Sequence, residues 1–274
     1  MKTITRCVLF YLAVSSNVHA IVLGSVDATN KYSSVGYTLT TAGGLGSVVA
    51  LDSNWVLTAA HVVESAPGLM VMGDAVAGTE GVYFFFDQVI THPNYMPGEF
   101  HDDLALIRLS DSDPIKPQPG VIDVSFATLS NVALTGSLPL TATITGYGLT
   151  SIDGDVDPNA PLVRRYGEAA TDPFGPAYPG FDPGFPFDCS LTMYLCTWST
   201  TGGAPGDSGG AMCLDYGGGD SVAGINSFIF DESDLQDPPG APNWDDGYWT
   251  VATSTAYYED WITGYVHNAM FGSA

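Results

Sequence analysis

The sequence predicts an all-β fold, of barrel or sandwich type, that ends in a single helix. Short apolar segments rich in β-branched and aromatic residues recur between clusters of Gly, Pro, Asp and Ser, which is typical of short strands joined by turns. Apolar residues at helical spacing become clear only at 254–271. The 274 residues, of which 45% are apolar, suffice for one or two compact domains with a sizeable core.

A proline-rich connector divides the predicted strands into two groups. It runs from Asp113 to Gly120 and contains three prolines, which interrupt strand pairing and favour a loop. We therefore expect an amino-terminal barrel at about 21–120, a carboxy-terminal barrel at about 121–253 and a terminal helix at about 254–271. The clearest strand segments are Gly46–Leu51, Trp55–Thr58, Gly81–Ile90, Leu104–Leu109, Leu138–Ile144 and Ser221–Phe230.

Residues 1–20 have the features of a secretory signal peptide. Lys2 and Arg6 precede a short apolar run, and Val18-His19-Ala20 forms a small-residue cleavage site. The run is much shorter than the roughly 20 apolar residues that a membrane-spanning helix needs. We expect an exported protein, secreted or periplasmic, with no membrane association after cleavage and with residues 21–274 as the mature domain. Cleavage after Ser15 is the alternative.

The charge balance excludes several classes of partner. The chain has 30 acidic and 7 basic residues, a net charge of −23, which repels nucleic acid and anionic lipid. Asp153, Asp155 and Asp157 alternate like the first ligands of a calcium-binding loop. Pro158 and Arg164 occupy the positions where such a loop needs glycine and glutamate, so no metal is predicted.

Three separated residues share a chemical reason to occur together. Ser208 lies between glycines, where no bulky neighbour would block its hydroxyl. His61 follows an apolar run and three small residues, and Asp103 precedes the apolar Leu104-Ala105-Leu106. A serine hydroxyl becomes a strong nucleophile when a histidine takes its proton and a carboxylate orients that histidine. His101 is the closest rival base and Asp102 the rival carboxylate, while a plain glycine-rich turn is the other interpretation of the serine segment.

These residues lie in motifs that resemble the trypsin/chymotrypsin-like serine endopeptidases, in the same order along the chain. The resemblance extends from about Ile21 to His267. It implies two packed six-stranded antiparallel β-barrels with a carboxy-terminal helix, an active site between the barrels, and hydrolysis of peptide bonds through an acyl-enzyme without a cofactor. The motifs are Thr58-Ala59-Ala60-His61, Asp103-Leu104-Ala105-Leu106 and Gly206-Asp207-Ser208-Gly209-Gly210, supported by Ile21-Val22-Leu23-Gly24, His92-Pro93-Asn94-Tyr95, Thr145-Gly146-Tyr147-Gly148, Gly224–Phe228 and Tyr257–Ile262.

The resemblance also implies roles for residues around the triad of His61, Asp103 and Ser208. The backbone N–H groups of Gly206 and Ser208 would form the oxyanion hole. The mature amino group of Ile21 would pair with Asp207. The substrate-binding residues would be Gly202, Ser227, Ile229 and Gly247.

The departures from the family pattern concern cysteines and the specificity pocket. Cys189 and Cys196 correspond to a family disulfide, whereas Val62 and Ala204 stand where other cysteines are usual, and Cys213 is left over as a buried thiol. Gly202 lies where trypsin has an aspartate. The uncharged pocket favours apolar or aromatic side chains over Arg or Lys, unless Asp245 or Asp246 enters it.

Three other functions are compatible with parts of the sequence. The serine segment fits the G-x-S-x-G elbow of lipases and esterases, but only His267 follows Ser208, and that fold needs acid and histidine after the serine. An inactive homologue that acts as a binding protein would usually lack a triad residue, and none is lacking here. A purely structural β-rich export protein would not need the three motifs. A monomeric enzyme that acts on protein or peptide substrates is the expected function.

Overall fold

A computed structural model describes residues 21, 24–41, 44–64, 68–73, 81–98, 100–117, 124–132, 141–148, 162–171, 193–197, 201–231, 248–267 and 269–272. The predicted signal peptide, Cys189 and Gly247 lie outside the described residues, as do Asp245 and Asp246. The side chain of Cys196 lies outside the description as well, so the disulfide stays a prediction.

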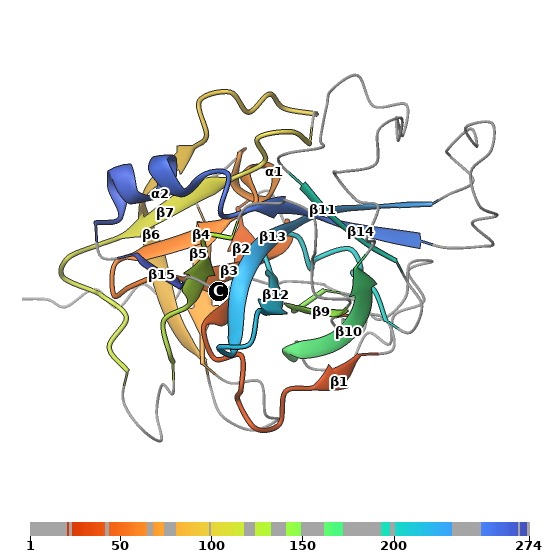
Figure 1. Ribbon diagram of the computed structural model, residues 1–274. Helices are drawn as coiled ribbons and strands as arrows, with labels where there is room; N and C mark the ends of the chain where they lie inside the picture. Colours follow the sequence, from red (N-terminus) through yellow and green to blue (C-terminus); the bar gives the residue numbers. More distant parts are fainter. Residues whose placement is uncertain are drawn as a thin grey trace, which may run out of the picture.

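The first half of the chain forms a closed antiparallel barrel in the order β2-β3-β4-β7-β6-β5 (Figure 1). Alternate residues point into it: Met70, Met72 and Phe84 are buried, whereas Tyr83 and Phe85 are exposed on the outer face. This alternation is the period-2 pattern of a strand with one buried face. The strands are β2 (Val35–Thr40), β3 (Leu45–Ala50), β4 (Trp55–Thr58), β5 (Gly68–Met72), β6 (Val82–Thr91) and β7 (Ala105–Leu109), and the short helix α1 (Ala60–Val63) follows β4.

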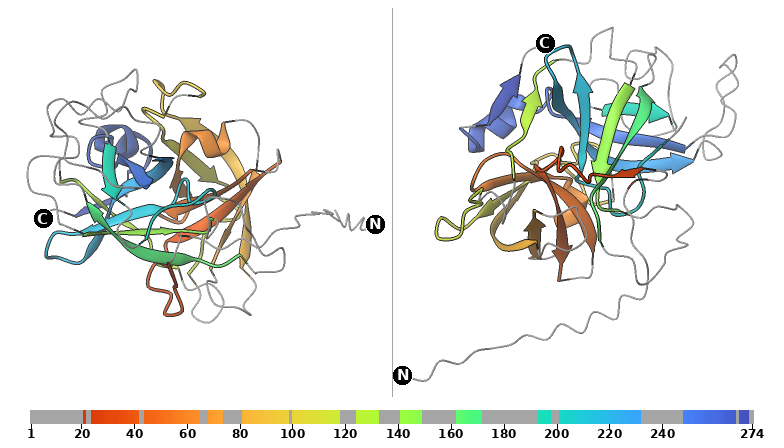
Figure 2. Two further views of the ribbon diagram at one scale, coloured as in Figure 1. Left: turned by 90° about the vertical axis from the view of Figure 1, so that its right-hand side faces the viewer. Right: turned by 90° about the horizontal axis from the view of Figure 1, so that it is seen from below.

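The second half forms another ring of six antiparallel strands. Neighbours pair in the order β12-β9-β10-β11-β14-β13, and β13 pairs back with β12 to close the ring. Figure 2 shows these green-to-blue strands packed beside the red-to-yellow strands of the first barrel. The strands are β9 (Thr141–Gly146), β10 (Arg165–Thr171), β11 (Met193–Thr197), β12 (Ala211–Asp215), β13 (Asp220–Asp231) and β14 (Tyr248–Ser254).

Three short strands and a helix complete the described part of the fold. Strand β1 (Ser25–Val26) pairs with β10, and β15 (Met270–Gly272) pairs in parallel with β8 (Thr128–Ser130). The helix α2 covers only Glu259–Tyr265, a shorter span than the predicted 254–271. Strand pairing limits it at both ends, because Ser254 pairs with Gly224 in the second barrel and Met270 pairs with Thr128.

The core continues from one barrel into the other. One cluster of buried side chains includes Leu57 and Leu106 of the first barrel, Ile225 of the second and Ile262 of α2. The all-β class, the barrels and the carboxy-terminal helix of the prediction are therefore confirmed. None of the helices in the described ranges is long and apolar enough to cross a membrane.

Candidate active site

His61 enters the boundary between the barrels from the first turn of α1. The small residues before it allow close packing, since Ala59 and Ala60 are fully buried. Its backbone N–H donates to Asp103 Oδ1 at 2.9 Å, and its ring Nδ1 lies 2.7 Å from Asp103 Oδ2. This double contact fixes the ring orientation and leaves Nε2 as the free ring nitrogen when Nδ1 carries the proton.

Asp103 is completely buried, two residues before β7 begins. Besides the two contacts from His61, its Oδ2 accepts a hydrogen bond of 2.5 Å from the hydroxyl of Ser227. Three donors from both barrels therefore converge on one carboxylate. A buried carboxylate that is fully hydrogen-bonded stays in one orientation and holds its histidine partner there.

The adjacent Asp102 points to a different set of partners. Its backbone is left-handed, with φ of 53°, which a short polar residue tolerates better than most. Oδ1 accepts a hydrogen bond from the Tyr258 hydroxyl at 2.8 Å, and Oδ2 lies 2.8 Å from His101 Nδ1. The structure thus brings Asp103 to His61 and keeps Asp102 and His101 apart from it.

Ser208 lies in the tight turn just before β12. Its hydroxyl donates to the carbonyl of Ser227 at 3.0 Å, and Ser208 and His61 line the same pocket. Residues 209 and 210 must be glycine because any side chain there would clash with a neighbouring strand. A Cβ on Gly209 would clash with the carbonyl of Ser47, and a Cβ on Gly210 would clash with the carbonyl of Thr145. The small residues therefore let the serine loop lie directly against β3 and β9.

Gly206 turns the backbone just before the serine. Its φ of 95° is left-handed and favours glycine, and its carbonyl accepts a hydrogen bond of 3.0 Å from the Ser47 hydroxyl. Within the described ranges, no acceptor binds the backbone N–H of Gly206 or of Ser208. Two donors beside the serine hydroxyl can therefore receive an anionic oxygen.

Asp207 points away from the pocket into the interior, where it is 2% exposed. Its carboxylate accepts hydrogen bonds from the N–H groups of Gly148 at 2.7 Å, Ala204 at 2.8 Å and Ile21 at 3.1 Å. Burial raises the pKa of Asp207 to about 7, and the three N–H donors act in the opposite direction. Ile21 is fully buried at the same place, so the two predicted partners are in contact.

A pocket of about 260 Å³ adjoins Ser208 and His61. Its apolar rim includes Phe100 and Phe228, whose rings stack at 4.6 Å between centroids, and Phe100 meets the ring of His61 edge-on. Of the predicted binding residues, Ser227 and Ile229 line the pocket. Gly202 is buried and is not among the lining residues, whereas its neighbour Gly203 is.

Sequence reasoning assigned no site role to seven residues that line this pocket. They are Phe100, Gly203, Ala204, Pro205, Asn226, Phe228 and Thr250. Thr250 pairs with Ile229 across β13 and β14, and its hydroxyl accepts the N–H of Gly203 at 2.8 Å. A methyl group placed on Gly203 would lie 3.1 Å from Thr250 Cγ2 and 3.5 Å from Ile229 Cγ2. The pocket is narrow at this point, between the turn that precedes the serine and the paired strands.

Comparison with known proteins assigns the chain to a family. The family model described as Trypsin matches residues 21–262. Serine protease 56 of Homo sapiens is 28% identical over 227 residues, which cover 78% of this chain and 33% of that protein. Chymotrypsin-like elastase family member 1 of Macaca fascicularis is 28% identical over 202 residues, 65% of this chain and 66% of that protein. The chain thus spans a third to two thirds of these relatives' length, and it belongs to the trypsin family of serine proteases.

Proposed function

We propose that the protein is an exported serine endopeptidase that cleaves protein or peptide substrates with Ser208 as nucleophile, His61 as base and Asp103 as the group that orients His61. The observation that carries the proposal is the convergence of these residues: His61 Nδ1 lies 2.7 Å from the buried Asp103, and His61 shares a pocket with Ser208. Removal of residues 1–20 on export is part of the proposal.

In the proposed reaction these residues act in sequence. His61 Nε2 takes the proton of Ser208 as Oγ attacks the peptide carbonyl carbon. The resulting oxyanion accepts hydrogen bonds from the N–H groups of Gly206 and Ser208. His61 then protonates the leaving amine, and a water molecule hydrolyses the acyl-enzyme with His61 again as base. The imidazolium that forms twice in this cycle is stabilised by Asp103.

The activation pair is part of the same proposal. Asp207 directly precedes Ser208, and its carboxylate is held by Ile21, Gly148 and Ala204. A free amino group on Ile21 would carry a positive charge to this buried carboxylate. That charge would stabilise the turn which directs the N–H groups of Gly206 and Ser208 toward the substrate oxygen.

The pocket supports a preference for small aliphatic side chains before the cleaved bond. An aromatic ring between two carbon surfaces needs a gap of about 7 Å, twice the usual carbon contact distance. Ile229 and Thr250 bring branched side chains to the pocket lining beside Gly203, and such side chains occupy space that an aromatic ring would need. Arg and Lys would find no described carboxylate in the pocket lining except the inward-facing Asp207.

A fluorophosphonate label tests the proposal directly. The reagent phosphonylates only a serine that a base activates, so the native protein should be labelled at Ser208 and lose activity on a casein substrate. Ser208→Ala and His61→Ala should both abolish labelling while their circular dichroism spectra stay native. Labelling that persists in Ser208→Ala would refute the assignment of the nucleophile, and a folded protein that never reacts would be a binding homologue.

A further inference from the structure

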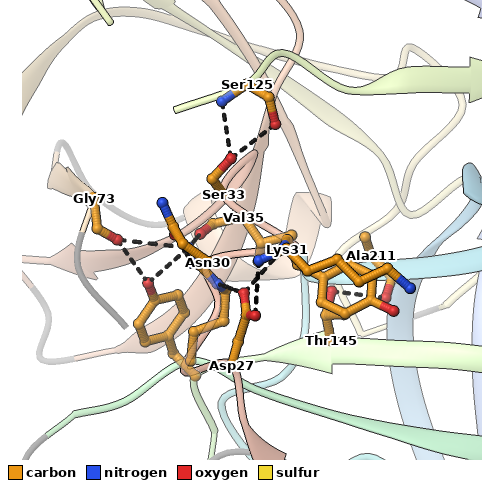
Figure 3. A network of polar contacts seen from close by, with 12 residues as sticks. Asp27, Asn30, Lys31, Ser33, Val35, Gly73, Ser125, Thr145 and Ala211 are labelled. Atoms are coloured by element: carbon orange, nitrogen blue, oxygen red, sulfur yellow. Dashed lines mark hydrogen bonds and ion pairs between the residues drawn. The ribbon is translucent and has the colours of Figure 1, made fainter. Parts of the chain in front are cut away.

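The guanidinium of Arg164 lies fully buried where three parts of the chain meet. Nε donates to Asp27 Oδ2 at 2.9 Å, Nη2 donates to Asn30 Oδ1, and Nη1 donates to the carbonyl of Val35 at 2.8 Å. Asp27 and Arg164 are both 0% exposed. Figure 3 shows Asp27, Asn30, Val35 and Gly73 close to one another within this network of polar contacts.

Asp27 belongs to the segment that begins at Ile21. Its carboxylate also accepts the backbone N–H groups of Lys31 at 2.8 Å and Tyr32 at 2.9 Å, which fixes the turn 27–32. Its own N–H donates to the carbonyl of Arg164 at 3.0 Å. Backbone and side chain of Arg164 thus both hold Asp27, six residues from Ile21.

The guanidinium of Arg164 also contacts Tyr147, whose neighbour Gly148 binds Asp207. Nη1 lies 3.4 Å from the hydroxyl of Tyr147, and the next residue, Gly148, donates its N–H to Asp207 at 2.7 Å. The N–H of Tyr147 donates to the hydroxyl of Ser47 at 3.0 Å. That hydroxyl in turn donates to the carbonyl of Gly206, so Arg164 contacts the same network that shapes the serine turn.

We infer that Arg164 is a positioning residue: its buried fork holds Asp27 and the Tyr147–Gly148 turn in register, so that the amino group of Ile21 reaches Asp207. The inference rests on the activation pair of the proposed function. Loss of the guanidinium would leave Asp27 as a buried, uncompensated carboxylate, which favours opening of its segment toward water. A point charge would not serve equally well, because the planar fork reaches Asp27, Asn30 and Val35 together.

The test is the chemical accessibility of the Ile21 amine. The exported protein is carbamylated with cyanate, and mass spectrometry gives the extent at the amino terminus, with the exposed Lys116 as internal reference. We expect Arg164→Met to raise carbamylation of Ile21 relative to Lys116 by at least about tenfold, as local opening exposes a buried group. Arg108→Met is the matched control, since among the residues that the structure describes this arginine pairs with the surface residues Asp87 and Asp111 and not with the buried network.

Asn30→Gly supplies a milder variant that keeps the buried ion pair. Asn30 has φ of 56°, which glycine adopts freely, so the change removes one partner of the fork without backbone strain. We expect a smaller rise in Ile21 carbamylation in the same direction. If Ile21 stays as protected in both variants as in the native protein, the inference is wrong.

The pH profile of kcat/KM separates positioning from a general loss of structure. A weaker Ile21–Asp207 contact lets the amine lose its proton at lower pH, so the alkaline limb should move toward the unperturbed value of about 7.7–8.0 in Arg164→Met. A uniform loss at all pH values would contradict the inference.

A native protein without peptidase activity would refute the proposed function alone, because the carbamylation result still decides the role of Arg164. If the exported chain begins before Ile21, hydrogen exchange at the Ile21 amide replaces carbamylation, with the same expected increase.

Discussion

Asp102 and Asp103 are adjacent in the sequence, but their side chains contact different partners. Asp103 faces His61 and Ser227, whereas the left-handed backbone of Asp102 directs its side chain to Tyr258 and His101. Asp103→Asn should lower kcat/KM on the order of 10⁴-fold, because the amide would hold the wrong tautomer of His61. Asp102→Asn retains an acceptor for Tyr258 and should stay within about tenfold of the native enzyme. Steady-state kinetics that reverse this order would move the role to Asp102.

The pH dependence of the folding stability should differ according to whether Ile21 is in a peptide bond or carries a free amino group, because Ile21 contacts the buried Asp207. Burial raises the pKa of Asp207 to about 7, so while Ile21 is in a peptide bond the folded state keeps a proton that the unfolded state loses near pH 4. The contribution of Asp207 to stability therefore falls as pH rises from about 4 through about 7, by no more than about 4 kcal/mol. A free, charged amine on Ile21 should weaken this dependence.

Denaturant titrations at pH 5 and pH 8 would measure that difference. An amino-terminally extended protein should lose more stability between the two pH values than the protein that starts at Ile21. Asp207→Asn provides the reference, since it cannot titrate. Equal slopes for the extended and the free form would show that the amine does not reach Asp207.

Strands β13 and β14 determine the pocket, and here the sequence was least informative. A register shift between Asn226 and Phe228 decides that Ile229 faces Thr250, and no local pattern reports such a shift. The sequence therefore indicated an uncharged pocket with Gly202 and Gly247 among its residues, and it gave no sign of Thr250. The positions of Thr250 and Gly203 in the pocket lining follow from the strand pairing and from the contact between these two residues, which only the structure gives.

The preference of the enzyme should follow from this pair of strands. We expect kcat/KM for substrates with Ala or Val before the cleaved bond to exceed that for Phe by about 10- to 100-fold, the discrimination that steric limits of this size provide. Ile229→Gly combined with Thr250→Gly should widen the gap and move the preference toward Phe. Kinetics on a matched peptide series would measure it, and a native enzyme that prefers Phe or Arg would contradict the prediction.

At the scale of the molecule, the predicted triad is assembled across the two barrels. His61 and Asp103 come from the first barrel, and Ser208 and Ser227 come from the second. The sequence predicted the all-β barrels because alternating apolar residues define the strands, while the assignment of catalytic roles to the three motifs stays a prediction. The contacts that hold the parts in register, such as Arg164 with Asp27, join residues 137 apart and have no sequence signature.

The position of the amino terminus after export determines whether the whole chain can become active without a second cleavage. If cleavage on export follows Ala20, the exported protein starts at Ile21 and needs no further protease to become active. Amino-terminal sequencing together with an activity assay would measure this. A start at Ser16 without activity would establish a precursor that requires a second cleavage.

The rate at which the buried free thiol of Cys213 is alkylated can be used to measure local unfolding of the second barrel. Cys213 lies on β12 within the shared core, is 5% exposed, and burial raises its pKa to about 12. A thiol that is both inaccessible and protonated does not react with iodoacetamide until the strand opens. Alkylation of the peptide that contains Cys213, followed by mass spectrometry, should therefore proceed at the rate set by the opening of the second barrel and accelerate with denaturant. Rapid alkylation in the native protein would show that β12 opens independently of the rest.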